Sequence, residues 1–171
     1  SRTHPTSHPS LMSHFVWDRI KAKPGIASVK GQEVTFVDGT NETYDSVIVA
    51  TGYQVDLPFL APQLRPIDGH RLELFLRVVH PAHPGLFFVG MFQPLGCIWP
   101  GAELQSKIAA RAIKGLWQRP KNIAELCQRE VTHPHLNQIK TPRHTITVDF
   151  HLFVKQLKKH LPKNYVSKSA I

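Results

Sequence analysis

A threonine and a glycine follow directly on a β-branched run, and both are suited to meet a ligand. The run covers residues 45–50, and Thr51, Gly52 and Tyr53 come after it. Because Gly52 has no Cβ, a ligand or a second backbone could approach it closely, and the Thr51 hydroxyl could donate or accept a hydrogen bond. A glycine turn after an ordinary core strand explains the same residues, and taken alone it is the commoner arrangement.

A second candidate site lies in residues 91–100, a stiff loop that holds two prolines and a glycine. A predicted helix begins near Gly101, so Glu103 and Gln105 belong to its first turns. A helix N-terminus carries free N–H groups and a partial positive charge, which favour an anion or an electron-rich carbonyl. A loop that only packs against the helix is an equally good interpretation of this segment.

Hydrophobic patterns predict the elements that would position these residues. Residues 45–50 and 86–90 are apolar runs without alternation, which is typical of strands buried on both faces of a parallel sheet. Ligands of such sheets bind at the carboxyl ends of the strands, where Thr51 and Gly52 would lie. Further strands are predicted over residues 26–29, 33–37 and 72–79, with a turn at Asp38-Gly39, and helices over residues 11–20, 101–117, 122–130 and 148–161. The pattern indicates an α/β fold.

Composition limits the classes of partner. The 171 residues carry a formal net charge of +9, which attracts polyanions such as nucleic acid, anionic membrane or phosphate-bearing cofactors. No nucleic-acid motif accompanies the charge, so solvated helix faces explain it more simply, and no specific nucleic-acid partner is expected. No apolar run approaches the ~20 residues that a membrane span needs. The basic residues in question are Lys107, Arg111 and Lys114 on one predicted helix and Lys155, Lys158 and Lys159 on another.

Cysteines and histidines offer little further chemistry. Two cysteines, Cys97 and Cys127, are too few for a disulfide framework, which favours a reducing cytoplasmic location. Cys97 is expected to be a small buried thiol rather than a nucleophile. The histidine pairs within residues 80–83 and 133–135 are interrupted by proline and have no cysteine at zinc-finger spacing, so no metal site is predicted. The first residue is not Met, which suggests a truncated or processed chain.

The two candidate segments together resemble the flavin-containing monooxygenase family. In that family a PLG–P–E-x-Q pattern follows the last sheet strand of the FAD domain, and its equivalent here has the same order and spacing. Residues 34–60, which include the ATGY sequence, are similar to the link between the family's two nucleotide domains, and residues 143–157 resemble its RHT…D segment. The resemblance covers nearly all of residues 15–160. The matching residues of the loop and helix are Pro94, Leu95, Gly96, Pro100, Glu103 and Gln105.

The resemblance implies a partial two-dinucleotide-binding flavoprotein fold with a helical C-terminal tail. Residues 1–44 would be the end of the NADPH-binding domain, and residues 45–120 the ATG crossover and the closing part of the FAD-binding domain. Residues 121–171 would be a helical extension. The implied cofactor-binding residues are Thr51 and Gly52 where the two nucleotide domains meet, Leu95 and Gly96 near the isoalloxazine, and Gly101, Glu103 and Gln105 near the pyrimidine end of the ring.

The parent enzyme implied by the resemblance uses FAD and NADPH. It forms a C4a-hydroperoxyflavin with O2 and transfers one oxygen atom to a soft nitrogen or sulfur nucleophile. The family's two G-x-G-x-x-G fingerprints have no counterpart here, because the ten glycines never form a G-x-G. The isolated chain is therefore expected to be inactive, and a missing N-terminal half would be its partner. A fragment of a Baeyer–Villiger-type flavoprotein and a non-enzymatic basic binding module derived from a flavoprotein remain alternatives.

Overall fold

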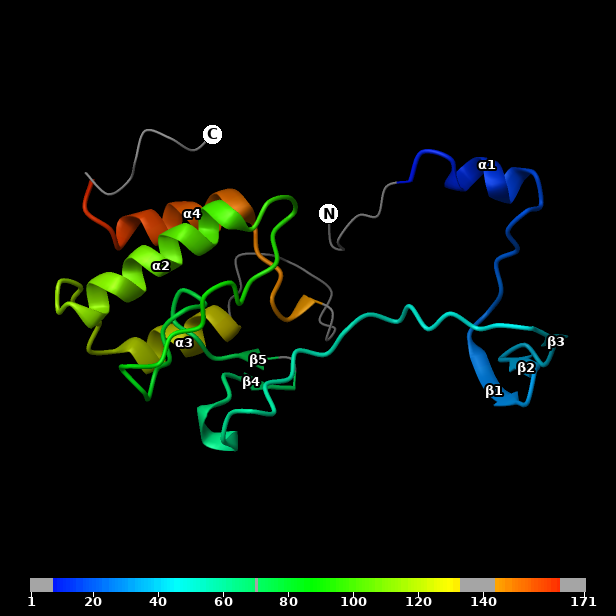
Figure 1. The fold of residues 1–171 in the computed structure, drawn as a ribbon, viewed down its shortest axis with the longest axis horizontal. Helices are drawn as coiled ribbons and strands as arrows, with labels where there is room; N and C mark the ends of the chain where they lie inside the picture. Colours follow the sequence, from blue (N-terminus) through cyan, green and yellow to red (C-terminus); the bar gives the residue numbers. More distant parts are fainter. Residues whose placement is uncertain (1–7, 70, 133–143, 164–171) are drawn as a thin grey trace. The chain divides into compact units, whose positions relative to one another are not determined.

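The computed structural model describes residues 8–69, 71–132 and 144–163, and the chain divides into two compact units (Figure 1). The smaller unit covers Pro5–Gly52, and the larger one covers Tyr53–Ile171 together with the first four residues. Both helices and strands are present, so a mixed α and β composition is confirmed. The strands within each sheet are antiparallel, and the partial two-dinucleotide-binding fold stays a prediction.

The smaller unit contains a three-stranded antiparallel sheet. Its strands β1 (Ile26–Lys30), β2 (Glu33–Phe36) and β3 (Asn41–Thr43) are neighbours in chain order. Val34 and Phe36 of β2 are buried, at alternate positions as the pleat requires. The predicted strands over residues 26–29 and 33–37 are therefore confirmed to within about a residue.

The predicted turn at Asp38-Gly39 joins β2 to β3. Gly39 has φ of 83°, a left-handed conformation that glycine adopts without steric cost. The Asp38 carboxylate accepts hydrogen bonds from the backbone N–H and the hydroxyl of Thr40, at 3.0 and 2.7 Å. These bonds lower the pKa of Asp38. Turn chemistry therefore sets the register of this hairpin.

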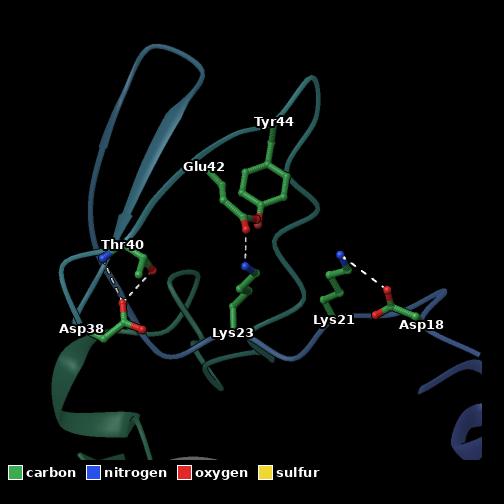
Figure 2. Close-up of polar contacts among 7 residues, drawn as sticks. All are labelled: Asp18, Lys21, Lys23, Asp38, Thr40, Glu42 and Tyr44. Carbon is green, nitrogen blue, oxygen red and sulfur yellow. Dashed lines mark hydrogen bonds and ion pairs between the residues drawn. The ribbon is translucent and has the colours of Figure 1, made fainter. Parts of the chain in front are cut away.

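Exposed polar contacts join the segment before β1 to β3 (Figure 2). The Lys23 ammonium donates to the Glu42 carboxylate, and the Tyr44 hydroxyl donates to the other carboxylate oxygen at 2.5 Å. The hydrogen bond from Lys23, followed by that from Tyr44, lowers the pKa of Glu42. Lys21 pairs with Asp18 at 3.6 Å in the same view. Because solvent screens such pairs, they orient this segment more than they stabilise the unit.

Helix α1 (Leu11–Val16) is shorter than the helix predicted over residues 11–20. The chain leaves the helix at Asp18, whose φ is 51°, and the Arg19 N–H donates to the carbonyl of His14. None of the helical residues is buried, so the predicted apolar face has no core beneath it among the described residues.

Three helices and a buried turn form the core of the larger unit. They are α2 (Trp99–Ile113), α3 (Ile123–Thr132) and α4 (Phe150–Lys159), and α2 and α4 lie side by side in Figure 1. Ile108 of α2 and Leu157 of α4 are fully buried. All three predicted helices are confirmed. Asp149 caps α4 by accepting the N–H of Leu152 at 2.9 Å.

The ends of α2 differ from the prediction for physical reasons. The helix begins two residues before Gly101, because Pro100 lacks an N–H and suits the first turn. It ends before residue 117, because the chain reaches Gly115, with φ of 68°, soon after its last turn.

The strands of the larger unit are short. A 3-10 turn η1 (Pro62–Leu64) precedes β4 (Ile67–Asp68), which pairs with β5 (Arg71–Leu72). The continuous strand predicted over residues 72–79 is wrong, because Leu76 and Arg77 have φ of 54° and 53° and fold the chain into a tight turn. The strand predicted over 86–90 is also wrong.

Residues 86–88 instead make a brief antiparallel contact with residues 78–80. The Phe88 N–H donates to the Val78 carbonyl at 2.8 Å, and the His80 N–H donates to the Leu86 carbonyl at 3.1 Å. Val78 and Val79 are 0% exposed. The apolar pattern of this region thus predicted burial correctly but predicted the wrong local structure.

The prediction for residues 45–50 is wrong in this structure. These residues form no strand, and Val47, Ile48 and Val49 are 56%, 90% and 79% exposed. A strand buried on both faces needs a strand along each edge and a layer over each face, and the described residues supply none of these to this segment. The residues therefore have the composition of a core strand without its surroundings.

Candidate functional site

The loop of residues 90–98 is anchored at its start and exposed in its middle. Phe92 is 1% exposed and packs against Phe153 of α4, with ring centroids 4.7 Å apart. Gln93 bonds through both its backbone groups, donating to Ile146 at 2.7 Å and accepting from Val148 at 3.0 Å. These contacts hold the loop against α4 and the segment before it.

The part of the loop that follows presents apolar side chains and open backbone to solvent. Leu95 is 53% exposed, and Trp99, the first residue of α2 directly after the loop, is 76% exposed. Gly96 has φ of 108°, and no atom lies within 4 Å of where its Cβ would be. This combination suits contact with a flat apolar surface, because the backbone at Gly96 can be approached closely.

The two cysteines lie in different environments, and that of Cys97 is not the one expected. Cys97 lies in this loop and is exposed, so the prediction of a buried thiol at residue 97 is wrong. The reason is that the loop buries Phe92 and leaves its tip outside. Cys127 of α3 is the buried thiol, and burial raises its pKa to about 12, which makes it unreactive at neutral pH.

Gln105 holds the loop to the rest of the larger unit. The side chain is 0% exposed. Its carbonyl oxygen accepts the Gly90 N–H at 2.8 Å, and its amide nitrogen donates to the carbonyls of Leu76 and Arg77 at 3.1 and 3.0 Å. One side chain therefore satisfies three backbone groups, two of them in the strained left-handed turn. The predicted contact of Gln105 with a cofactor stays a prediction.

Gly101 is buried at the beginning of α2, where it allows close packing. A Cβ at this position would lie 2.4 Å from Cζ of Phe92, well inside contact distance. The N–H groups of Gly101 and Ala102 both donate to the Ile98 carbonyl at 3.1 Å. The helix N-terminus thus has fewer free N–H groups than the sequence suggested, since Pro100 has none.

Glu103 points away from this packing and is exposed. It pairs with Lys107 one turn later at 2.7 Å, so part of the predicted basic face is neutralised. The loop and α2 together bring five of the seven predicted site residues onto one continuous element. These five are Leu95, Gly96, Gly101, Glu103 and Gln105.

Thr51 and Gly52 belong to the smaller unit and are described separately. Both are exposed. Gly52 has φ of 96°, and no atom lies within 4 Å of where its Cβ would be. The predicted roles of both residues in cofactor binding stay predictions.

A half-buried group of ionisable and polar side chains that the sequence did not reveal lies beside the Leu76–Arg77 turn. Arg77 donates to the Thr145 carbonyl at 3.1 Å, and burial lowers its pKa. Burial raises the pKa of Glu130 to about 7, although the charge of Arg77 opposes this shift. Gln156 donates to the Glu130 carboxylate at 3.4 Å. No local motif joins these residues, which come from the turn, α3 and α4.

His80 is held in its neutral form by the backbone around it. Its Nδ1 accepts the N–H groups of Ala82 and His83, both at 3.1 Å, and burial lowers its pKa. Among the described residues, no group of three or more His, Cys, Asp or Glu side chains is arranged to hold a metal ion. The pair His133 and His135 lies outside the described residues.

None of the helices in the described part of the chain is long and apolar enough to cross a membrane.

Comparison with known proteins places most of the chain in one family. The model of the family described as flavin-binding monooxygenase-like matches residues 1–164. The chain is 30% identical to flavin-containing monooxygenase 5 of Homo sapiens over 152 residues. These residues are 86% of this chain and 28% of that protein. The corresponding protein of Cavia porcellus is 32% identical over 155 residues, with the same two shares.

A differently named relative gives a similar result. Dimethylaniline monooxygenase 2 of Rattus norvegicus, described as N-oxide-forming, is 33% identical over 132 residues, which are 73% of this chain and 24% of that protein. The chain therefore spans about a quarter of the length of the curated relatives that it matches.

Proposed function

Because this chain belongs to the flavin-binding monooxygenase-like family, we propose that it forms the closing part of the flavin site of an FAD- and NADPH-dependent monooxygenase. The observation that carries this proposal is the loop of residues 90–98, which is rigidly anchored by Phe92 and Gln105 yet exposes Leu95 and the open backbone of Gly96. An anchored loop with an apolar, accessible tip is suited to form one wall of a site for a flat ring.

The residues present fit the ring of the flavin but not its phosphates. Leu95 and Trp99 would cover an aromatic surface and exclude water from it, and Gly96 would let the backbone approach closely. The ten glycines of the sequence never form the G-x-G of a pyrophosphate cradle. When bound, FAD supplies the activation of O2 with electrons from NADPH.

Within this chain the proposed roles are binding and positioning. Leu95 and Gly96 would line the isoalloxazine, and Gln105 would keep their loop in place through its bonds to Gly90 and to the turn. The exposed carboxylate of Glu103, near the beginning of α2, would face the pyrimidine end of the ring. Thr51 and Gly52 would meet the cofactors at the boundary between nucleotide domains.

The proposed fold is the closing portion of a two-dinucleotide-binding flavoprotein. In this assignment residues 1–44 end the NADPH-binding domain, residues 45–120 complete the FAD-binding domain, and residues 121–171 extend it. The exposed, unpaired thiol of Cys97 is compatible with a reducing cytoplasmic compartment.

The proposed reaction inserts one oxygen atom of O2 into a soft nitrogen or sulfur nucleophile. The name of the rat relative, an N-oxide-forming dimethylaniline monooxygenase, supports a nitrogen nucleophile. The chain alone is expected to retain no FAD and to oxidise no NADPH, since it lacks a phosphate cradle.

The test is flavin content and NADPH oxidation, measured first with the purified chain. The chain is then mixed with a flavin-containing monooxygenase from which the matched segment has been deleted. Dimethylaniline and thioanisole are the substrate probes, and a ketone probe detects Baeyer–Villiger chemistry instead. Flavin retention and amine-dependent NADPH oxidation only in the mixture would support the proposal. Salt-sensitive oligonucleotide binding with no flavin response would favour a basic binding module and overturn it.

A further inference from the structure

Arg77 bonds to both of the anchors that hold the loop of residues 90–98. Its backbone carbonyl accepts the Gln105 amide at 3.0 Å, and the Gln105 side chain in turn accepts the Gly90 N–H at 2.8 Å. Its guanidinium donates to the Thr145 carbonyl at 3.1 Å. One residue therefore joins two segments that lie 28 and 68 positions further along the chain.

The segment that begins at Thr145 holds the middle of the same loop. Gln93 donates its N–H to the Ile146 carbonyl at 2.7 Å and accepts the Val148 N–H at 3.0 Å, and residues 93 and 147 form a parallel β-bridge. The bonds thus follow a closed path. It runs from the start of the loop to Arg77, and from Arg77 back to the middle of the loop.

Arg77 occupies this position at two costs. Its φ of 53° is a left-handed conformation, which a glycine would adopt without strain. The side chain is half-buried, and the loss of water around the guanidinium lowers the pKa of Arg77, although the charge of Glu130 opposes this shift. Because lost hydration offsets most of what a buried cation gains, stability does not explain this arginine. What its side chain adds is the bond that joins the two anchors.

We propose that Arg77 is a positioning residue of the flavin site, because it fixes the loop whose tip, Leu95 and Gly96, meets the isoalloxazine. The inference rests on the proposed function and adds to it a residue that acts only through the loop. The wall of a binding site must hold its position to within about 0.5 Å, so a residue away from the ring can determine the affinity for it.

Loss of the guanidinium would leave most of the loop contacts in place. Phe92 would still pack against Phe153, and Gln93 would still bond to Ile146 and Val148. What would be lost is the bond between the Thr145 segment and the turn. The expected result is a larger motion of the loop tip in a folded chain, which distinguishes positioning from a general structural role.

The test uses a nitroxide spin label on Cys97, which lies at the loop tip. Cys97 is exposed, whereas Cys127 is buried with a pKa of about 12, so the reagent labels the tip selectively. Arg77→Met keeps much of the side-chain volume and removes the guanidinium. We expect this variant of the full chain to shorten the rotational correlation time of the label by about threefold or more. Arg77→Lys retains a charged donor for the carbonyl and should restore the value to within about 1.5-fold.

Two controls separate positioning from a general loosening of the unit. Arg129→Gln removes a charge from an exposed residue of α3 and should leave the Cys97 label unchanged. A label moved to exposed Ser106 of α2, by Cys97→Ser with Ser106→Cys, should respond to Arg77→Met by less than about 1.5-fold. Equal responses at both label sites, or no response at Cys97, would overturn the proposal. If Arg77→Met does not fold, Arg77→Gly replaces it, since glycine adopts this φ without strain.

Flavin retention separates this inference from the proposed function. Each chain is mixed with FAD and a flavin-containing monooxygenase from which the matched segment has been deleted, and the FAD retained after gel filtration is measured. We expect Arg77→Met to weaken FAD binding by about 10-fold and Arg77→Lys to restore it. Equal FAD binding by Arg77→Met and the unmodified chain would overturn the role of Arg77 in the flavin site. No FAD retention with any chain would overturn the proposed function, while the label would still report whether Arg77 fixes the loop.

Discussion

Residues 45–53 and residues 74–80 are both short runs rich in apolar side chains, but their surroundings are opposite. Val78 and Val79 are 0% exposed, the Val78 carbonyl accepts the N–H of Phe88, and the backbone groups of Val79 bond to Phe75. Ile48 and Val49 are 90% and 79% exposed, without a backbone partner among the described residues. An apolar run is therefore buried only where the chain supplies atoms to cover it.

The two regions also differ in how their backbone polar groups are hydrogen-bonded. At residues 76 and 77 a costly left-handed turn is stabilised because Gln105 bonds both carbonyls. At residues 46–52 no backbone group bonds to another backbone group among the described residues. The first region is therefore hydrogen-bonded by distant parts of the same chain, whereas the second is not bonded in this way by the described residues.

A charged side chain placed in each of the two runs should give the largest difference in stability. Val79→Asp buries a carboxylate without a partner and should cost more than about 4 kcal/mol, enough to prevent folding of the larger unit. Val49→Asp should change stability by less than about 0.5 kcal/mol, because the side chain is in water. Urea unfolding followed by far-UV circular dichroism reports the helical unit. Comparable losses in the two variants would contradict the comparison.

Removing the Gln105 amide should have the next largest effect. Gln105→Leu keeps the volume but leaves two carbonyls and one N–H buried without partners, at a cost of about 3 kcal/mol. The control Gln118→Leu, at an exposed position shortly after the same helix, should cost less than about 0.5 kcal/mol. The denaturant midpoints of the two variants are compared. Equal midpoints would contradict the stabilising role assigned to the hydrogen bonds of Gln105.

A methyl group at Gly101 should cost less, because Phe92 can shift part of the way. Gly101→Ala places a Cβ 2.4 Å from the Phe92 ring and is expected to destabilise the unit by about 1–3 kcal/mol. Gly85→Ala serves as the control, since no atom lies within 4 Å of its Cβ position. If the thermal midpoints of both variants match that of the unmodified chain, close packing does not explain this glycine.

The smallest expected effect concerns the pH dependence caused by Glu130. Because the folded state raises the pKa of this carboxyl from 4.5 to about 7, the protonated form is favoured. The contribution of this raised pKa to the free energy of unfolding is fully present below about pH 4.5 and is lost as pH rises through 7. Glu130→Gln should therefore be more stable than the unmodified chain at pH 8 by about 1–2 kcal/mol, and equal at pH 4.

The control for this prediction is Glu125→Gln at an exposed position of the same helix. It should leave the stability difference between pH 4 and pH 8 unchanged. The lowered pKa of His80 makes the protein more stable as pH rises, which is opposite to the effect of Glu130. This contribution is the same in the unmodified chain and in the variant, so it does not affect the difference between them. An unchanged pH profile for Glu130→Gln would contradict the buried state assigned to this carboxyl.

Local patterns were sufficient to predict several elements. Helical periodicity predicted α2, start and stop signals predicted α3 and α4, and Asp38-Gly39 predicted the hairpin turn. The family was also predicted, because the PLG–P–E-x-Q spacing is a local signature and the family model matches residues 1–164.

Long-range contacts could not be predicted in this way. Gln105 meets Leu76 and Arg77 across 29 and 28 positions, and nothing in the sequence around residue 105 marks its partners. The left-handed turn at two non-glycine residues likewise depends on contacts with residues distant in the sequence, among them Gln105 and Thr145. The exposed state of residues 45–50 was missed because their composition reports the environment that suits them, and not whether the chain provides it.

Hydrogen exchange of the backbone amides tests the central claim most directly. In the chain alone, the account predicts slow exchange for Val79, His80 and Gly90, and exchange at residues 46–52 as fast as in an unfolded peptide. On addition of a flavin-containing monooxygenase from which the segment matched by this chain has been deleted, residues 46–52 should become protected by orders of magnitude. Strong protection of residues 46–52 in the chain alone, or no change on binding, would contradict the claim that this chain completes the sheet of a flavoprotein.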